Sequence, residues 1–321
     1  MGMASSWSSG YNYRLINAGE IENKGIEIAL NTRLIQTKDF SWDLNLNFSK
    51  NQNKVKELVD GVDMFELEKA SWLDVQVAAK VGENYGSIIG PDFQRNENGD
   101  ILIDPSTGLP MYDKSSHILG NASWDWTGGL VTTLAYKNLS LSAVFDVKVG
   151  ADLYSMSARS AYESGKALET LQGREEWYRS EEQRKAAGFP KGSPDWKPTG
   201  GFIAPGVIDN GDGTYRPNDI YINPEDYWMS VCRNAPSMFI YDNSYVKCRE
   251  LTLTYQFPKK LLKNVVDNLT ISFVARNPFI VYKNIPNIDP DSNYNNTTGM
   301  GLEYGSLPSR KSYGFNVNIK F

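Results

Sequence analysis

Strict alternation of apolar and polar residues in paired segments is the feature that most constrains how this chain folds. The first segment starts at Ile26, with Ile28 and Leu30 on the same side and Glu27 on the opposite side. A period of two is typical of a β-strand whose two faces meet different surroundings. After the short polar stretch 37–39 the alternation resumes, which predicts an antiparallel hairpin with a tight turn.

The same pattern returns along the rest of the chain. The alternating apolar residues of the later segments are Trp42, Leu44, Leu46, Phe48, Trp124, Trp126, Leu130, Leu134, Tyr136, Leu139, Leu141, Phe145, Val147, Leu251, Leu253, Tyr255, Phe257, Leu269, Ile271, Phe273, Ala275, Tyr313, Phe315, Val317, Ile319 and Phe321. We count roughly nine such strands, each near the ~9–11 residues that a tilted strand needs to cross a bilayer.

The connections between these strands alternate between short and long. The short ones, expected at one end of the sheet, are 37–39, 80–83, 137–138 and 258–267. The long ones, expected at the other end, are 54–70, 95–120, 155–242 and 282–308. Short turns on one side and long loops on the other are typical of outer-membrane barrels. We therefore expect an all-β fold, an antiparallel transmembrane β-barrel segment over residues 1–321, with an extracellular insertion at 155–242. The insertion is expected to contain one or two short helices before residue 188, and then irregular structure with a small hairpin near 207–222.

Composition excludes several classes of protein. Lys and Arg number 33 against 38 Asp and Glu, a net charge of −5, so the basic surface of a general nucleic-acid binder is missing. No apolar run approaches the ~18 residues of a membrane-spanning helix. A mean hydropathy of −0.44 remains compatible with a membrane barrel, because only alternate residues of its strands face lipid.

Few residues suit catalysis or metal binding. The chain has one histidine, His117, and two cysteines, Cys232 and Cys248, too few for a zinc site or a histidine-based triad. We expect no enzyme activity and no cofactor, and the acidic pair Asp100 and Asp104 lies in a turn-rich segment that predicts no shared cleft. Whether the cysteines form a disulfide or remain thiols is open from their spacing.

Two oxygen-rich turns are weak candidates for a metal site. Asp289 and Asp291 have the every-second-residue spacing that begins a calcium loop, but the glycine and glutamate of that loop are missing. Asp209 and Asp212 form the second turn. In both turns the favoured interpretation is local hydrogen bonding rather than a metal.

Aromatic residues of the long insertion are the candidate ligand contacts. They are Trp177, Tyr178, Trp196, Tyr215, Tyr221 and Trp228. Aromatic side chains in loops commonly serve recognition, and here they would stack on cargo or on a partner protein. The alternative is a small satellite core that folds the insertion onto the strands.

Four stretches of the chain, in the same order, resemble the barrel of SusC/RagA-type TonB-dependent outer-membrane transporters of Bacteroidetes. They read Ile16-Asn17-Ala18-Gly19-Glu20-Ile21-Glu22-Asn23-Lys24-Gly25-Ile26-Glu27, Ile118-Leu119-Gly120-Asn121-Ala122-Ser123-Trp124-Asp125-Trp126-Thr127-Gly128-Gly129, Ala275-Arg276-Asn277-Pro278-Phe279 and Leu307-Pro308-Ser309-Arg310-Lys311-Ser312-Tyr313-Gly314-Phe315. The resemblance implies that the chain is the C-terminal part of the barrel, without the plug domain and the earlier strands. The first residues contain no charged and then apolar segment, so no signal peptide is expected within them.

This resemblance also implies a function and partners. Such transporters import bulky oligosaccharides or oligopeptides across the outer membrane, with a SusD-like surface lipoprotein as a lid and with the TonB system acting on the plug. The family resemblance further suggests that Asp289 and Pro290 have a structural role.

The last strand resembles the signal that the barrel-assembly machinery reads. Its alternating residues are Tyr313, Phe315, Val317, Ile319 and Phe321. The alternative is an ordinary edge strand of a soluble sheet, but an open apolar edge would favour aggregation, which barrel closure prevents.

The rival to the transporter hypothesis is a soluble all-β binding or structural protein with a sandwich core. In a sandwich, loops of comparable length are expected at both ends of the strands. The one-sided loop lengths favour the barrel.

Overall fold

The computed structural model describes residues 2–4, 7–11, 13–15, 19–69, 75–262, 266–293, 295 and 298–321. Residues Ile16, Asn17 and Ala18 of the first matching stretch lie outside this set. Near the N-terminus, β1 (Gly2–Ala4) pairs with β2 (Tyr13–Leu15), and η1 (Trp7–Ser9) lies between them.

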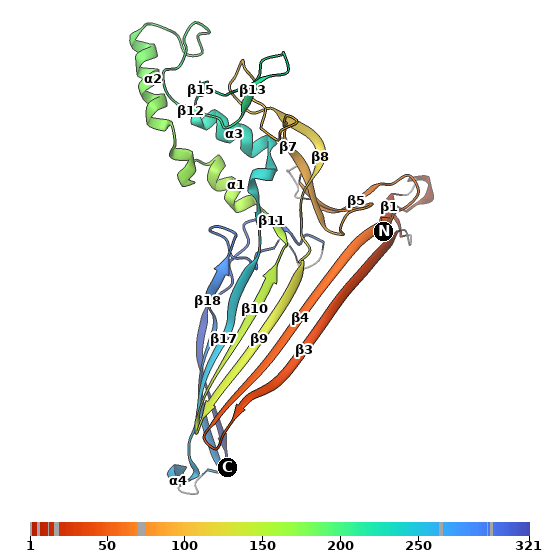
Figure 1. Ribbon diagram of the computed structural model, residues 1–321, viewed down its shortest axis with the longest axis vertical. Coiled ribbons are helices and arrows are strands. Elements are labelled where there is room, and N and C mark those ends of the chain that lie inside the picture. Colours follow the sequence, from red (N-terminus) through yellow and green to blue (C-terminus); the bar gives the residue numbers. More distant parts are fainter. Residues whose placement is uncertain are drawn as a thin grey trace.

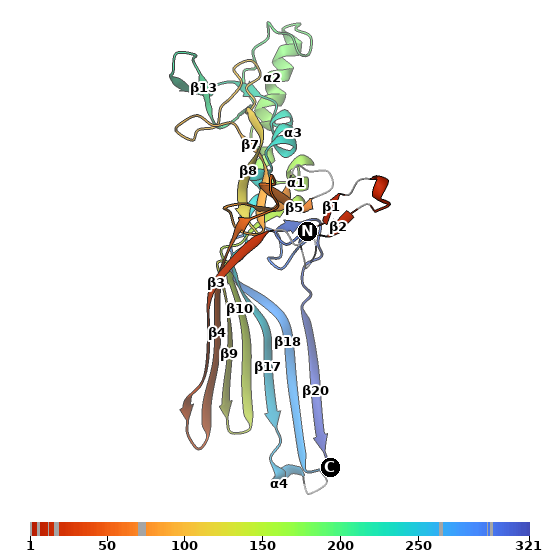
Figure 2. The ribbon, with the colours of Figure 1, turned by 90° about the vertical axis from the view of Figure 1, so that its right-hand side faces the viewer.

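A seven-stranded antiparallel sheet is the largest element of the fold. Its strands in spatial order are β20 (Ser312–Lys320), β18 (Asn268–Lys283), β17 (Tyr245–Gln256), β10 (Leu139–Val149), β9 (Trp126–Tyr136), β4 (Phe40–Glu57) and β3 (Glu20–Gln36). Figures 1 and 2 show these strands as one long, twisted layer. Within the described residues the sheet is open, with β3 and β20 as its edges, so the chain shows a curved sheet and not a closed barrel.

Cross-strand register gives this sheet one continuous apolar face. Residues directly opposite each other in neighbouring strands lie on the same face. One such row crosses all seven strands and consists of Ile35, Trp42, Leu134, Leu141, Leu253, Phe273 and Phe315. The next residues along the strands, such as Thr254, Ser140 and Ser272, form the polar face.

No second layer of the described chain covers the apolar face. Leu253 is 44% exposed, Phe273 38% and Phe315 78%. In a sandwich these side chains would be buried against a second sheet. The observed exposure therefore argues against the soluble sandwich.

Tight turns join the strands at one end of the sheet, which we call the tight-turn end. Residues 37–39 join β3 to β4, and Lys137 and Asn138 join β9 to β10, with Lys137 at a φ of +53°. The β17–β18 connection includes the short helix α4 (Lys259–Leu262). Figure 2 shows α4 and the C-terminus at this end. The other helices and the strands outside the seven-stranded sheet lie at the opposite end, which we call the long-loop end.

The expectation of about nine strands in the sheet, with 80–83 among its tight turns, is wrong. A separate four-stranded sheet consists of β5 (Met64–Lys69), β6 (Gln76–Lys80), β7 (Ser87–Phe93) and β8 (Tyr112–Asn121). The backbone N–H of Val55 donates to the carbonyl of Glu83 at 2.9 Å, which holds the 80–83 turn beside the last residues of β4, at the long-loop end. Strand β7 is buried on both faces, as is typical of a strand inside a packed core. It therefore differs from the strands of the seven-stranded sheet, which have one exposed apolar face.

Residues 152–242, the insertion head, connect β10 to β17. The first part of the head, up to residue 188, contains two α-helices, as the sequence predicts. A third helix, Pro224–Asn234, lies in the second part, which was predicted to be irregular apart from a small hairpin. Its elements are β11 (Asp152–Ser155), α1 (Met156–Glu163), η2 (Leu168–Leu171), α2 (Arg174–Ala186), β12 (Phe202–Ile203), β13 (Val207–Asp209), β14 (Tyr215–Pro217), β15 (Tyr221–Ile222), α3 (Pro224–Asn234), η3 (Pro236–Phe239) and β16 (Ile240–Asp242). The pair β13–β14 is the predicted hairpin.

Buried apolar residues join the head to the four-stranded sheet. Val231 and Phe239 of the head share one core with Val77 and Ile88. Both cysteines are buried free thiols, with Cys232 on α3 and Cys248 on β17. Burial raises the pKa of the Cys232 thiol to about 12, so this thiol stays protonated.

A bulge in β18 explains one of the matching stretches. The pairing of β17 with β18 skips Asn277 and Pro278. Asn277 has a φ of +47°, and its side-chain amide donates to the carbonyl of Arg310 at 3.2 Å. Asparagine tolerates this left-handed conformation better than other non-glycine residues. Pro278 lacks a backbone N–H and fits beside the bulge, where the ladder is interrupted.

We predict that Asn277→Val lowers the free energy of unfolding by about 2 kcal/mol, because a β-branched residue is strained at positive φ. Asn277→Gly should cost less, since glycine adopts this conformation freely. Urea unfolding in detergent micelles, followed by tryptophan fluorescence, measures both, with Asn316→Val on extended β20 as the control. Equal losses for the valine and glycine variants would contradict the conformational explanation.

Candidate ligand site

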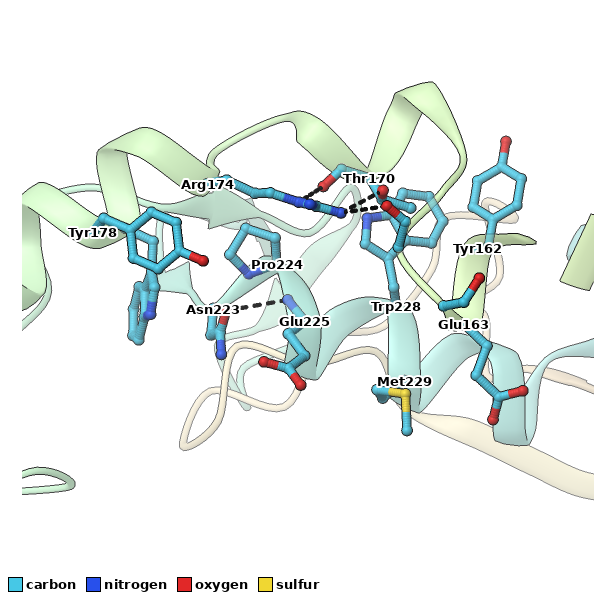
Figure 3. A pocket seen from close by; sticks show the side chains of 13 residues that line it. Tyr162, Glu163, Thr170, Arg174, Tyr178, Asn223, Pro224, Glu225, Trp228 and Met229 are labelled. Atoms are coloured by element: carbon cyan, nitrogen blue, oxygen red, sulfur yellow. Dashed lines mark hydrogen bonds between the residues drawn. The ribbon is translucent and has the colours of Figure 1, made fainter. Parts of the chain in front are cut away.

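A pocket of about 220 Å³ opens between α1, η2, α2 and α3 of the insertion head. Figure 3 shows the side chains that line it. Helix capping positions these elements: the Ser155 side chain accepts from the Ala158 backbone N–H at the start of α1, and Asn223 accepts from the Glu225 N–H at the start of α3. Pro224 occupies the first turn of α3, where no N–H is required.

Aromatic side chains from three helices surround the pocket. Trp177 and Tyr178 come from α2, Tyr162 from α1 and Trp228 from α3. Tyr178 is 67% exposed and is available to a ligand, whereas Trp228 is buried. The ring centroids of Tyr162 and Trp228 lie 4.8 Å apart, so Trp228 supports the pocket wall.

Polar groups of the pocket are mostly used inside the head. Arg174 donates from Nε to the Thr170 carbonyl at 2.6 Å and from Nη2 to the Thr170 hydroxyl at 2.7 Å and the Gly165 carbonyl at 2.9 Å. Glu163 pairs with Arg159 at 3.2 Å, and Glu225 is exposed at the start of α3. Burial and the neighbouring Glu169 carboxylate raise the pKa of Tyr162, so its hydroxyl stays protonated.

This arrangement suits binding rather than covalent chemistry. The aromatic rings offer apolar contact, and the exposed Glu225 carboxylate and the Tyr178 hydroxyl offer hydrogen bonds. His117 lies elsewhere, on β8, where it pairs with Asp113 at 2.9 Å. Among the residues that line this pocket there is no histidine, serine–base pair or thiol arranged as a nucleophile.

Three of the six aromatic residues singled out in the sequence line the pocket: Trp177, Tyr178 and Trp228. The other three are spread over the head. Trp196 packs against Phe189, and Tyr215 and Tyr221 lie on β14 and β15. Trp228 also belongs to the buried core, so it serves the satellite core that the sequence left as an alternative.

No pattern in the sequence indicated Tyr162, Arg174 or Glu225 as pocket residues. The helix-capping pattern Asn223-Pro224-Glu225 could have predicted the start of α3, and with it the position of Glu225 in the first turn of that helix. Arg174 carried no signal, since its three acceptors are backbone and hydroxyl oxygens that only the folded chain brings together.

The weak metal candidates have other partners. Asp289 and Asp291 pair with Lys247, at 3.2 and 2.5 Å. Asp209 accepts from the Gly211 N–H at 2.7 Å and Asp212 from the Thr214 N–H at 2.9 Å, as in Asx turns. Across the described residues no three His, Cys, Asp or Glu side chains are grouped so as to hold a metal ion.

The residues of the candidate assembly signal lie on the outermost strand. Tyr313, Phe315, Val317 and Ile319 of β20 share the apolar face with their partners on β18. Phe321 follows the strand and is 86% exposed. No helix in the described part of the chain has the length and hydropathy that a membrane crossing needs.

The chain is similar to several TonB-dependent receptors. TonB-dependent receptor P3 of Formosa agariphila is 25% identical over 340 residues, which cover 98% of this chain and 30% of the receptor. TonB-dependent receptor SusC of Bacteroides thetaiotaomicron is 21% identical, over 95% of this chain and 27% of the receptor. The chain thus spans less than a third of the length of these relatives. No family model matches the sequence.

Solved structures agree on the fold. The structure of the RagAB peptide transporter superposes with a TM-score of 0.63 at 17% identity, over 99% of this chain and 31% of that chain. The "open-open" state of the RagAB peptide importer gives the same TM-score at 18% identity. The relatives are receptors and transporters rather than enzymes, in agreement with the expectation of no catalysis. The resemblance to SusC/RagA-type TonB-dependent receptors that the four sequence stretches indicate is therefore confirmed.

Proposed function

We propose that this chain forms the C-terminal part of the barrel of a TonB-dependent importer for bulky nutrients in the outer membrane of a Gram-negative bacterium. The observation that carries the proposal is the uncovered apolar face, on which one row of residues near the tight-turn end crosses all seven strands while the opposite face is polar. In a transmembrane barrel the apolar face contacts lipid and the polar face lines the lumen. Strands β9 and β10 have 11 residues each, enough to cross a bilayer at a tilt.

The open edges support a larger barrel. Strands β3 and β20 each have one unpaired side in the described sheet, and backbone groups in the hydrocarbon region require partners. The proposed partners are earlier strands of the same protein, in keeping with relatives more than three times as long as this chain. A plug domain of the kind that the family resemblance implies would connect the barrel to the TonB system.

The long-loop end faces the cell exterior in this proposal, and residues 155–242 form an extracellular insertion. A SusD-like surface lipoprotein would cover this end as a lid. The superposed structures are those of a peptide transporter and a peptide importer, which supports a peptide cargo. The SusD-like partner and the oligosaccharide alternative follow from the resemblance to the family of SusC. Trp177 and Tyr178 of the head pocket would contact the cargo.

We expect Leu253→Lys to reduce the amount of folded protein in the outer membrane. A lysine on the lipid face of a barrel costs about 2–4 kcal/mol at the bilayer midplane and less toward the interfaces; Leu253 lies three residues before the tight-turn end of β17, so its cost falls below that maximum. Thr254→Lys, one residue along on the polar face, is the matched control and should assemble normally. Folded protein is measured as the fraction that keeps its compact form in unheated SDS gels. Similar losses for both variants would show that the two faces do not differ in their surroundings.

Phe321→Asp should slow barrel assembly, because it removes the terminal aromatic residue of the candidate signal. Lys320→Asp changes the charge of the adjacent residue and leaves the aromatic pattern intact, so its assembly should be close to that of the unchanged protein. Pulse–chase labelling of membrane fractions gives the two rates. Normal assembly of Phe321→Asp would argue against the signal.

Tyr178→Ala should weaken cargo binding by roughly tenfold, since stacking on an exposed aromatic ring contributes about 1–1.5 kcal/mol. Tyr215→Ala removes an aromatic residue of the same head outside the pocket and should bind normally. Binding of fluorescently labelled oligosaccharide and oligopeptide mixtures to the detergent-solubilised complex measures the effect. Unchanged binding by Tyr178→Ala would exclude the pocket as a cargo site and leave the transporter proposal standing.

A further inference from the structure

The guanidinium of Arg174 lines the head pocket and is held in one orientation by neutral acceptors. Its Nε and Nη2 donate to oxygens of Thr170 and Gly165 at 2.6 to 2.9 Å. Thr170 is 1% exposed, and a Cβ at Gly165 would lie only 2.8 Å from Nη2, so the arginine packs closely onto both residues. A long side chain fixed in this way has already lost the rotational freedom that binding a ligand would otherwise cost.

These three bonds leave the positive charge of Arg174 without a counter-ion. Among the described residues no carboxylate pairs with Arg174, and its Nη1 group has no acceptor. Glu163 lines the same pocket but pairs with Arg159, at 3.2 Å. Because guanidinium groups form strong, charge-assisted hydrogen bonds with carboxylates, the half-buried Arg174 favours an anionic group of a ligand.

A carboxylate without a partner lines the pocket from another helix. Glu225 lies in the first turn of α3 and is exposed, and its carboxylate has no partner within the part of the chain that the structure describes. Its backbone N–H, and not its side chain, takes part in the Asn223 cap. Figure 3 shows the Glu225 carboxylate well apart from the Arg174 guanidinium. The two charges therefore do not neutralise each other, and the pocket offers one positive and one negative group.

The size of the pocket limits what it can hold. Its volume of about 220 Å³ is below the roughly 300–1,000 Å³ of pockets that enclose a drug-sized ligand. A bulky cargo would therefore insert only one short segment. The exposed ring of Tyr178 and the neighbouring Trp177 would contact the apolar part of that segment.

We propose that the head pocket binds a peptide segment that carries both charges, with a carboxylate at Nη1 of Arg174 and a cationic group at Glu225. The inference rests on the proposed transport function and narrows the cargo of this site. A neutral oligosaccharide would displace water from both charged groups without pairing either, which lowers affinity. A uronic-acid oligosaccharide would pair with Arg174 alone.

Capture from a peptide mixture tests the carboxylate contact. A proteolytic digest of casein is offered to the detergent-solubilised complex untreated and after its carboxyl groups have been converted to methylamides, and mass spectrometry quantifies the retained peptides. Methylamidation should lower retention by the unchanged protein about tenfold, the loss of one charge-assisted contact. Arg174→Gln should lower retention of the untreated digest by a similar factor and abolish the difference between the two digests. Arg179→Gln, an exposed arginine of α2 outside the pocket, is the control.

Glu225→Lys tests the second charge and keeps the inference falsifiable if Arg174→Gln does not fold. It places two cations in the pocket, so the retained peptides should become more acidic, with about threefold fewer lysine- and arginine-containing peptides than in the unchanged protein. Loss of folding cannot produce this shift in composition. Glu182→Lys makes the same change at an exposed position of α2 outside the pocket and should leave the composition unchanged.

The outcomes separate this inference from the proposed function. Peptide retention that does not respond to methylamidation, or an unchanged peptide composition in folded Glu225→Lys, would overturn the inference and leave nutrient import standing. Stronger retention of neutral or uronic-acid oligosaccharides, offered in parallel, would overturn it in favour of a sugar cargo. Retention of neither peptides nor oligosaccharides by the unchanged protein would contradict both the inference and the proposed function.

Discussion

The register of the seven-stranded sheet is the constraint on which the rest of the structure depends. Because side chains alternate with a period of two, a slip of one residue in any strand would move its apolar residues to the polar face. The row from Ile35 to Phe315 shows that all six pairings keep the same parity. Where parity changes along a strand, a bulge accompanies it: Cys248 and Leu251 lie on one face although they are three residues apart, because the ladder skips Arg249.

Bulges, charges and loops are concentrated at the long-loop end. The β17 bulge places Arg249 beside Asp146 and Asp291, and the β18 bulge at Asn277 is hydrogen-bonded to Arg310, just before β20. The polar face at this end is therefore occupied by a compact ionic cluster rather than by open solvent. In the connection between β18 and β20, the buried Glu303 accepts from the Ser155 hydroxyl of the head at 2.8 Å, and the head in turn presents the aromatic pocket. The bulges in β17 and β18 thus fix part of the connection between β18 and β20, and this connection contacts the insertion head that carries the pocket.

Much of the sheet was predictable from the sequence, because in a strand with one apolar and one polar face every second residue is apolar. The hairpins at 37–39 and 137–138 and the strands around Leu253 and Phe273 follow this rule. Strand β7 (Ser87–Phe93) does not alternate between apolar and polar residues, because both of its faces are buried, and its place in a separate sheet could not be predicted from the period of two. The alternation gave no indication of the pocket or of the ion pairs between Lys247 and Asp289 and Asp291. Trp177 and Trp228 were recognisable as aromatic loop residues, but Tyr162 and Arg174 join them only through the packing of three helices. Asp289 and Asp291 resembled a turn, and their partner Lys247 lies more than 40 residues away.

Site-directed spin labelling along β17 tests the two-faced sheet most directly. Single labels would replace Leu251, Leu253 and Tyr255 on the apolar face and Thr252, Thr254 and Gln256 on the polar face, with Cys248 replaced by serine and the protein in lipid bilayers. We predict that collisions with molecular oxygen, which concentrates in lipid, are frequent at the first three positions, and that collisions with a water-soluble nickel chelate are frequent at the other three. Low accessibility of the apolar-face labels to both reagents would mean that protein covers this face, and it would contradict a membrane-facing sheet.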